Sequence, residues 1–309
     1  MKALLLTNLR ITIAAVAVFV GLIQSSQAAG PDLYVTDNFG SVFEFAPDGS
    51  RITFATGLDR PTGLAFDSSG DLFVSESDTG IIYKYDSFGV QSVFATGLTR
   101  PFGLTFDTLG NLFVADFGTA NFINPDGAIY KFTATGTRST FASGLLAPVD
   151  LAFSPTGDLF VADFGRGSIY EFNPLGVETL FANVPRPEGL AFDAAGDLFA
   201  TIGQANGSRT ITKFNAAGMG TLFAGGLNNP GGLAFDMNGD LFDAESGIGE
   251  ILKFDSGGNS TVFASGVGTP VFLAFGPTSN VMVPEPSTIS LIIVGACGIL
   301  CRNRLRKKV

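Results

Sequence analysis

The sequence has 309 residues, of which 46% are hydrophobic and 15% charged, and its formal net charge is −10. That length suits one large domain or two ordinary ones. The 28 acidic residues all lie between Asp32 and Glu285 with only 11 of the 18 basic ones, so this stretch carries a net charge of −17. A surface this acidic repels phosphate groups, and a nucleic-acid partner is not expected.

The first 28 residues have the features of a secretory signal peptide. Lys2 and Arg10 precede an apolar stretch over 11–23, and Ser26 and Ala28 place small residues at −3 and −1 of a cleavage site. Cleavage after Ala28 or Ala29 would export the rest of the chain. A retained N-terminal anchor helix is the alternative.

Residues 29–283 form one repetitive domain. The commonest form of the repeat is "GLAFD", a short turn, and then "DLFV". The central phenylalanines of six copies, 39 to 47 residues apart, are Phe66, Phe106, Phe153, Phe192, Phe235 and Phe275. Each unit holds four short runs rich in Phe, Val, Ile and Leu, separated by Gly/Asp/Ser turns at hairpin distance. This pattern predicts an all-β fold, a six-bladed β-propeller with four-stranded antiparallel blades.

The two ends of the repeat region are incomplete in complementary ways. The chain enters at "DLYV" (32–35), a second strand with no first strand before it. It ends at "VFLAF" (271–275), a first strand with no complete blade after it. We therefore expect both ends to share one blade, which closes the ring and removes the exposed sheet edges.

The repeat "P-x-G-L-A-F-D-x-x-G-D-L-F-V-A-D" followed by "G-x-I-Y-K-F" resembles the NHL repeat over almost all of 32–283. The usual histidine of that repeat is missing, because the chain contains no histidine at all. Propeller lyases similar to this repeat family depend on histidine, so the resemblance implies no lyase activity. Lactonase-like six-bladed propellers hold a divalent cation in the channel with Glu, Asp and Asn, which makes a metal-dependent lactonase the alternative to a non-catalytic module.

The channel positions argue against a metal. The residues just before the inner strands are Thr62, Phe102, Val149, Glu188, Gly231 and Val271. Glu188 is the one carboxylate among them, and Asp150 on a neighbouring blade could join it. A hard cation takes about six oxygen ligands. Without histidine, triads and imidazole metal clusters are also excluded. We predict no catalytic residue, no metal and no cofactor, with Glu188 solvated at the channel mouth.

One face of the predicted ring gathers arginines, acids and aromatic residues. The acids that end the second strands, expected to accept backbone N–H bonds and to pair with the arginines of this face, are Asp37, Glu76, Asp116, Asp163 and Glu245. Two longer connections, 118–127 and 203–208, lie on the same face, where binding commonly evolves. The predicted binding face consists of Arg60, Arg100, Arg186, Phe117, Phe122, Phe164 and Glu188. Alternatively, the aromatic residues fill gaps between blades.

The C-terminal segment 284–309 has three parts. Pro-Glu-Pro is followed by a 13-residue apolar run over 289–301 and then by an arginine-rich end. The motif residues are Val283, Pro284, Glu285, Pro286 and Ser287. This order resembles the PEP-CTERM sorting signal of Gram-negative bacteria, which a membrane exosortase reads and cuts. A plain single-pass anchor is the alternative. Both cysteines, Cys297 and Cys301, lie in this segment, so the body has no disulfide.

Taken together, these features predict hydrophobic helices at both ends of a propeller that is exported and held briefly in the membrane by its C-terminal helix. Processing by the exosortase would then leave it at the cell surface or in the exopolysaccharide matrix. Its expected role is non-catalytic binding or scaffolding, with an extracellular polysaccharide or a surface protein as partner.

Overall fold

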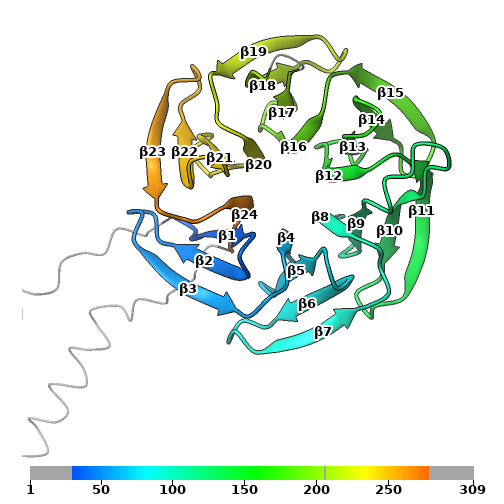
Figure 1. The fold of residues 1–309 in the computed structure, drawn as a ribbon, viewed down its shortest axis with the longest axis horizontal. Coiled ribbons are helices and arrows are strands. Elements are labelled where there is room, and N and C mark those ends of the chain that lie inside the picture. Colours follow the sequence, from blue (N-terminus) through cyan, green and yellow to red (C-terminus); the bar gives the residue numbers. More distant parts are fainter. Residues whose placement is uncertain (1–29, 205–206, 278–309) are drawn as a thin grey trace, which may run out of the picture. The chain divides into compact units, whose positions relative to one another are not determined.

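The computed structural model describes residues 30–204 and 207–277. Within these ranges the chain forms 24 strands and no helix, arranged as six four-stranded antiparallel sheets around a central axis (Figure 1). The all-β, six-bladed prediction is confirmed. The predicted signal peptide, sorting motif and terminal helices lie outside the described residues.

Blades 1 to 3 follow one another along the chain, each with its innermost strand first. Blade 1 contains β4 (Pro61–Phe66), β5 (Leu72–Glu76), β6 (Ile81–Tyr85) and β7 (Gln91–Ala95). Blade 2 contains β8 (Pro101–Phe106), β9 (Leu112–Asp116), β10 (Gly127–Phe132) and β11 (Arg138–Leu145). Blade 3 contains β12 (Pro148–Phe153), β13 (Leu159–Asp163), β14 (Ser168–Phe172) and β15 (Glu178–Asn183).

Blades 4 and 5 continue this order, and blade 6 joins the two ends of the domain. Blade 4 contains β16 (Pro187–Phe192), β17 (Leu198–Gly203), β18 (Arg209–Phe214) and β19 (Gly220–Gly225). Blade 5 contains β20 (Pro230–Phe235), β21 (Leu241–Glu245), β22 (Glu250–Phe254) and β23 (Ser260–Ser265). Blade 6 contains β24 (Pro270–Phe275), β1 (Leu33–Asp37), β2 (Ser41–Phe45) and β3 (Arg51–Thr56).

Ring closure occurs as the incomplete ends predicted. β24 pairs with β1 in the register Leu33↔Phe275 and Val35↔Leu273, so the last strand becomes the innermost strand of the blade that the first three begin. The N–H of Gly276 also donates to the carbonyl of Asp32, with an N···O distance of 2.8 Å. The inner edge of β1 is therefore covered, and no blade is left incomplete.

A cluster of aromatic rings fills each gap between blades, centred on Tyr34 between blades 6 and 1 and on a phenylalanine in the other gaps. In the gap between blades 1 and 2, Phe73 of the second strand contacts Phe94 and Phe106 edge-on, with centroids 4.9 and 5.1 Å apart. Between blades 3 and 4, Phe160 contacts Phe181 and Phe192 at 4.9 and 5.0 Å. Each such ring pair adds roughly 0.5–1.5 kcal/mol beyond the burial of its apolar area. The repeated Phe positions thus form the core that holds neighbouring blades together.

The hairpins between first and second strands are held by their own aspartates. In "DSSGD", Oδ1 of Asp67 accepts the N–H groups of Ser69 and Asp71 at 2.8 and 3.0 Å. Gly70 has φ +84°, a conformation that a side chain would strain. These acids serve the turn itself, as expected for an Asx turn. They are not part of a calcium loop.

Candidate functional site

The acids that end the second strands fix the connections between blades. Oε1 of Glu76 accepts the N–H of Asp59 at 2.7 Å. Both oxygens of Asp116 accept backbone N–H groups, from Thr99 and Arg100, at 2.8 Å each. The predicted backbone bonds are therefore confirmed. The predicted pairing with the arginines of this face is wrong for Arg60, whose partner is Asp78 at 3.0 Å.

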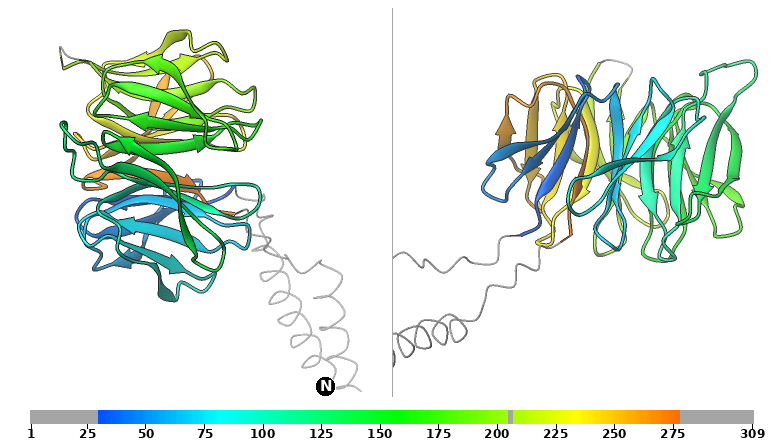
Figure 2. Two further views of the ribbon diagram at one scale, coloured as in Figure 1. Left: turned by 90° about the vertical axis from the view of Figure 1, so that its right-hand side faces the viewer. Right: turned by 90° about the horizontal axis from the view of Figure 1, so that it is seen from below.

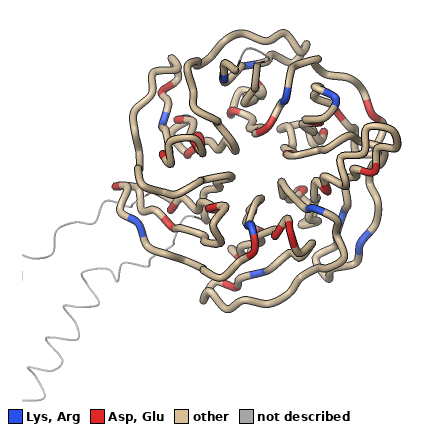
Figure 3. Tube along the Cα trace, viewed as in Figure 1, with Lys and Arg blue, Asp and Glu red and all other residues tan. Residues whose placement is uncertain are grey.

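Arg60 and Arg100 make other contacts, Arg60 with Asp78 and Arg100 with the ring of Phe117. In the part of the chain that the structure describes, the ion pair to an acid that ends a second strand is made by another arginine, between Arg166 and Asp163 at 3.8 Å. Figure 3 shows that acidic and basic residues occur around the whole ring rather than in one patch.

A pocket of about 270 Å³ lies at the channel mouth on the face that carries the longer connections. Figure 2 shows the β9–β10 connection, in green, rising from one face of the ring. The residues that line this mouth pocket are Phe102, Phe117, Val149, Phe164, Glu188, Gly231, Val271 and Phe272. Five of the six predicted channel positions thus contribute. Thr62 does not, since it is buried and its hydroxyl donates to the carbonyl of Pro101 at 2.9 Å.

One wall of the mouth pocket is an aromatic stack. The rings of Phe102 and Phe117 lie 5.2 Å apart at an interplanar angle of 29°. The guanidinium carbon of Arg100 lies 4.5 Å from the centroid of Phe117, within cation–π distance. Phe117 and Phe164 have equivalent local positions, because their N–H groups donate to the carbonyls of Arg100 and Ala147 at 2.9 and 3.1 Å. The repeat therefore places two phenylalanines from neighbouring blades beside the same opening.

Glu188 is the charged residue of the mouth pocket, and it is already paired. Its Oε1 lies 2.8 Å from Nη1 of Arg209, and both side chains are about one quarter exposed. Burial raises the pKa of Glu188, while the charges of Arg209 and Arg186 act in the opposite direction. The expectation of a simply solvated Glu188 is wrong. Arg209 begins β18 directly opposite Gly203, the last residue of β17, which places its side chain on the same edge of blade 4 as Glu188.

Asp150 serves as a tie between blades and does not line the mouth pocket. Its Oδ2 accepts the N–H of Leu190 at 2.8 Å, which links β12 of blade 3 to β16 of blade 4. Burial raises the pKa of this carboxyl to about 7. Asp150 lines instead a hollow of about 550 Å³ among the inner strands.

These residues do not fit a divalent cation of the lactonase type. Glu188 is neutralised by Arg209, and Asp150 accepts a backbone bond from the next blade. Over 30–204 and 207–277, no group of three or more His, Cys, Asp and Glu residues is placed to hold a metal ion. A hard cation needs about six oxygen ligands, so the channel lacks most of the set.

Some residues of the predicted binding face lie close together in the structure, and others lie apart. Phe117, Phe164 and Glu188 line the mouth pocket, and Arg100 stacks on Phe117. Arg186 lies close enough to influence the pKa of Glu188. Arg60 pairs with Asp78 elsewhere on the ring, and Phe122 is 75% exposed in the β9–β10 connection, outside the pocket lining.

Two charged residues that the structure places in notable surroundings were missed from the sequence, namely Arg209 and Asp243. Arg209 follows the longer connection 203–208, and no feature of the repeat pattern indicates that it would lie near Glu188. The repeat pattern does single out Asp243, because the same position of the other second strands is held by Val35, Val74, Val114, Val161 and Ala200.

No protein-family model and no curated protein matches this chain. Solved structures of the same architecture do. A gluconolactonase from Xanthomonas campestris superposes with a TM-score of 0.63 at 17% identity, covering 82% of this chain and 97% of that one. A catalytically inactive virginiamycin B lyase from Staphylococcus aureus, solved with quinupristin, gives a TM-score of 0.59 at 17% identity, covering 82% and 94%.

The likeness is one of fold. A PQQ-bound aldose sugar dehydrogenase from Streptomyces coelicolor gives a TM-score of 0.60 at 17% identity, covering 82% of this chain and 90% of that one. Proteins described by such different names share the architecture, so it does not select an activity. In the residues with described structure, no helix is long and apolar enough to cross a membrane.

Proposed function

We propose that this chain is a non-catalytic binding module whose ligand site is the mouth pocket. The observation that carries this proposal is the pocket lining. Four phenylalanine rings, Phe102, Phe117, Phe164 and Phe272, surround an opening whose one carboxylate is neutralised by Arg209. Such a lining supplies contact area and orientation but no unpaired acid, base or metal ligand.

The pocket suits the ring of a sugar or a similar flat group. A volume of about 270 Å³ accommodates roughly one ring. The apolar face of a sugar can stack on Phe117 or Phe164, while the Arg100 guanidinium and the Glu188–Arg209 pair offer hydrogen-bond partners for hydroxyl groups at the rim. An extracellular polysaccharide is therefore the proposed partner, and a surface protein is the second candidate.

The segments outside the described residues suggest where this binding takes place. Residues 1–28 are proposed to direct export, 29–283 to form the NHL-type propeller, and 284–309 to act as a PEP-CTERM sorting signal read by an exosortase. Support for this comes from the sequence motifs alone. On this proposal the mature protein acts at the cell surface or in an exopolysaccharide matrix.

Replacing the phenylalanine side chains of the mouth pocket with alanine tests the binding site. We expect Phe117→Ala and Phe164→Ala each to weaken polysaccharide binding roughly tenfold, since an aromatic contact contributes about 1–2 kcal/mol. Phe122→Ala is the matched control, because this ring is exposed but lies outside the pocket lining. Affinities are measured by titration calorimetry on the full chain after a glycan screen has selected the ligand. Equal affinities in all three variants would contradict the proposed site.

A lactonase is the second candidate, and the fold shared with gluconolactonases favours it. The paired state of Glu188 speaks against it. Hydrolysis of gluconolactone that requires a divalent cation and is lost in Glu188→Gln would replace the binding module with an enzyme.

A further inference from the structure

Four blades carry the same cation site. In each, a lysine of the third strand lies over the phenylalanine opposite it on the second strand. The distances from Nζ to the ring centroid are 5.2 Å for Lys84 over Phe73, 5.0 Å for Lys131 over Phe113, 5.1 Å for Lys213 over Phe199 and 5.3 Å for Lys253 over Phe242. All four lie within cation–π distance.

The acids of the nearby hairpin complete each of these sites. The shortest ion pairs join Lys84 to Asp71 at 2.7 Å, Lys131 to Asp107 at 3.3 Å, Lys213 to Asp197 at 2.8 Å and Lys253 to Asp240 at 2.8 Å. A hydrogen bond to Asp71 raises the pKa of Lys84, and Lys213 and Lys253 are affected in the same way by their hairpin acids. The environment beside the ring therefore favours a protonated amine.

Blade 3 has a phenylalanine at the same position of its second strand, Phe160, but Glu171 replaces the lysine. Glu171 stands opposite Phe160 in the strand register, as Lys84 stands opposite Phe73. The hairpin has the same backbone, since the N–H of Ser154 donates to the carbonyl of Asp158 at 2.9 Å. Within the described residues, no ion pair involves Glu171. The ring is present with one hairpin acid, Asp158, because Ser154 stands where the hairpins of the four lysine-bearing blades have an aspartate, and among the described residues no lysine or arginine pairs with Glu171.

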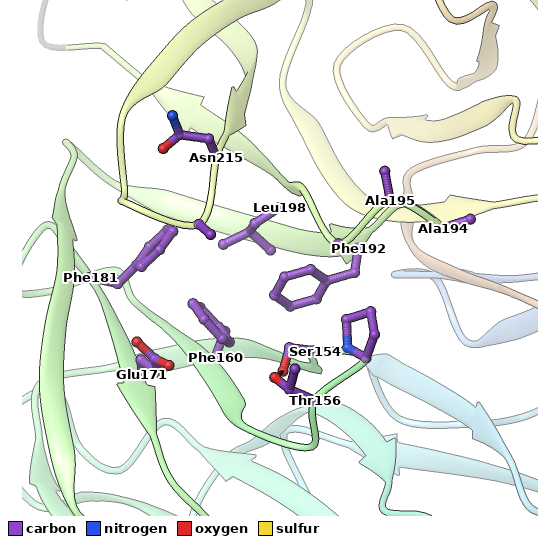
Figure 4. A pocket seen from close by; sticks show the side chains of 13 residues that line it. Ser154, Thr156, Phe160, Glu171, Phe181, Phe192, Ala194, Ala195, Leu198 and Asn215 are labelled. Atoms are coloured by element: carbon purple, nitrogen blue, oxygen red, sulfur yellow. Dashed lines mark hydrogen bonds between the residues drawn. The ribbon is translucent and has the colours of Figure 1, made fainter.

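A pocket of about 330 Å³ lies at this position between blades 3 and 4. Figure 4 shows the Glu171 carboxylate beside the ring of Phe160, with Phe181 and Phe192 around the same cavity. The equivalent pocket between blades 5 and 6 has about 410 Å³ and is lined by Lys253. There the protein provides its own ammonium group, whereas between blades 3 and 4 the charged lining residue is an acid.

We propose that the pocket between blades 3 and 4 binds a primary ammonium group on a short alkyl chain from outside the protein. The ammonium group lies over the Phe160 ring, as the lysine ammonium groups lie over the equivalent rings in four other blades. Its ion-pair partner is Glu171, whereas the lysines pair with hairpin acids. The alkyl chain packs against Phe181, Phe192 and Leu198, which line the pocket. This site is separate from the mouth pocket and shares no lining residue with it.

The test uses n-butylammonium as probe and the full chain as target. Protein-observed NMR titration of the wild type is expected to show saturable shifts in the millimolar range, centred on residues 154–160 and 171. Uncharged n-butanol is the probe control. Glu171→Gln is expected to weaken binding about fivefold, because the charge is lost while the cavity and the ring remain.

Glu171→Lys is the decisive variant, because it gives blade 3 the lysine of the other blades. It is expected to abolish butylammonium binding and to keep or raise the melting temperature. Glu178→Lys, an equal charge change at an exposed position of β15, is the matched control and retains wild-type binding. Absence of saturable shifts in the wild type, or unchanged binding in Glu171→Lys, would overturn the proposal. Phe117→Ala in the mouth pocket leaves butylammonium binding unchanged, so this result is independent of the proposed function.

Discussion

Asp243 is where the chain departs most from its own repeat. The other second strands place valine or alanine there, facing the preceding blade, and Asp243 is fully buried. Its two carboxylate oxygens and Oε1 of Glu245 have no hydrogen-bond partner among the described residues. Burial raises the pKa of Asp243 well above its usual value, and the neighbouring Glu245 raises it further. Ionising two neighbouring buried carboxyl groups together costs a large free energy, because each charge is desolvated and the two repel each other. Asp243 therefore retains its proton in the folded state.

Replacing Asp243 with valine is therefore expected to stabilise the propeller by roughly 1–3 kcal/mol, the usual cost of an unsatisfied buried polar group. The sign of the pH dependence follows from the raised pKa. The folded state holds the proton while the unfolded chain, with a carboxyl pKa of 3.8, releases it, so the stability of the wild type falls as pH rises above about 4. The gain in Asp243→Val should thus increase with pH. Urea unfolding between pH 4 and pH 8 measures both effects.

The reciprocal change Val161→Asp provides the control for this prediction. Val161 has the same strand position in blade 3 and is fully buried. The Val161→Asp variant should be less stable than the wild type, whereas the Asp243→Val variant should be more stable. An Asp243→Val variant no more stable than the wild type at pH 8 would mean that the contacts of Asp243 with Glu245 and with the backbone of Gly231 already compensate for its burial.

β24 carries the closure of the ring. It pairs with β1 and places the buried Leu273 in the core that blades 5 and 6 share. Deleting residues 269–283 should expose the edge of β1 and the inner ends of two blades at once. Because each blade packs on two neighbours, the loss should propagate as one cooperative transition at a much lower melting temperature, or prevent folding.

Calorimetry of the truncated chain against the full chain measures this. Deleting only 284–309 is the matched control, since all 24 strands remain. If the chain lacking 269–283 melts at the same temperature as the full chain, the stability of the propeller does not depend on the pairing of β24 with β1 in blade 6.

At the scale of the whole molecule, the chain combines the propeller with two terminal segments whose proposed roles concern export. We expect the segment from Thr288 to Val309 to be removed, leaving a mature protein that ends near Pro284–Ser287. Three sequence features support this expectation: the apolar run of 13 residues is short for a membrane span, the C-terminal end is basic, and prolines flank Glu285.

The intact mass of protein recovered from cells with the sorting protease tests this expectation. Cells without the protease are the control and should retain the full tail. A mass that still includes "RNRLRKKV" in the presence of the protease would make the segment a plain anchor.

The blades, their number and the sharing of blade 6 by the two ends of the domain could all be predicted from the sequence. Strand alternation and turn residues are local, and a repeat of 39 to 47 residues multiplies them six times. The hairpin role of Asp67 and the backbone bonds of Glu76 and Asp116 were also predictable, because an acid at a strand end lies close to the connection that it holds.

Only the tertiary structure decided which side chains meet across blades. Glu188 pairs with Arg209, 21 positions away, and the Phe102–Phe117 stack forms where β8 begins and β9 ends. The open pocket at Phe160 and the unpartnered Asp243 likewise depend on the fit between neighbouring sheets. Such contacts depend on side-chain reach and on the packing of one blade against the next. A periodic pattern specifies the blade but not these distances, so the candidate sites could be found only in the folded ring.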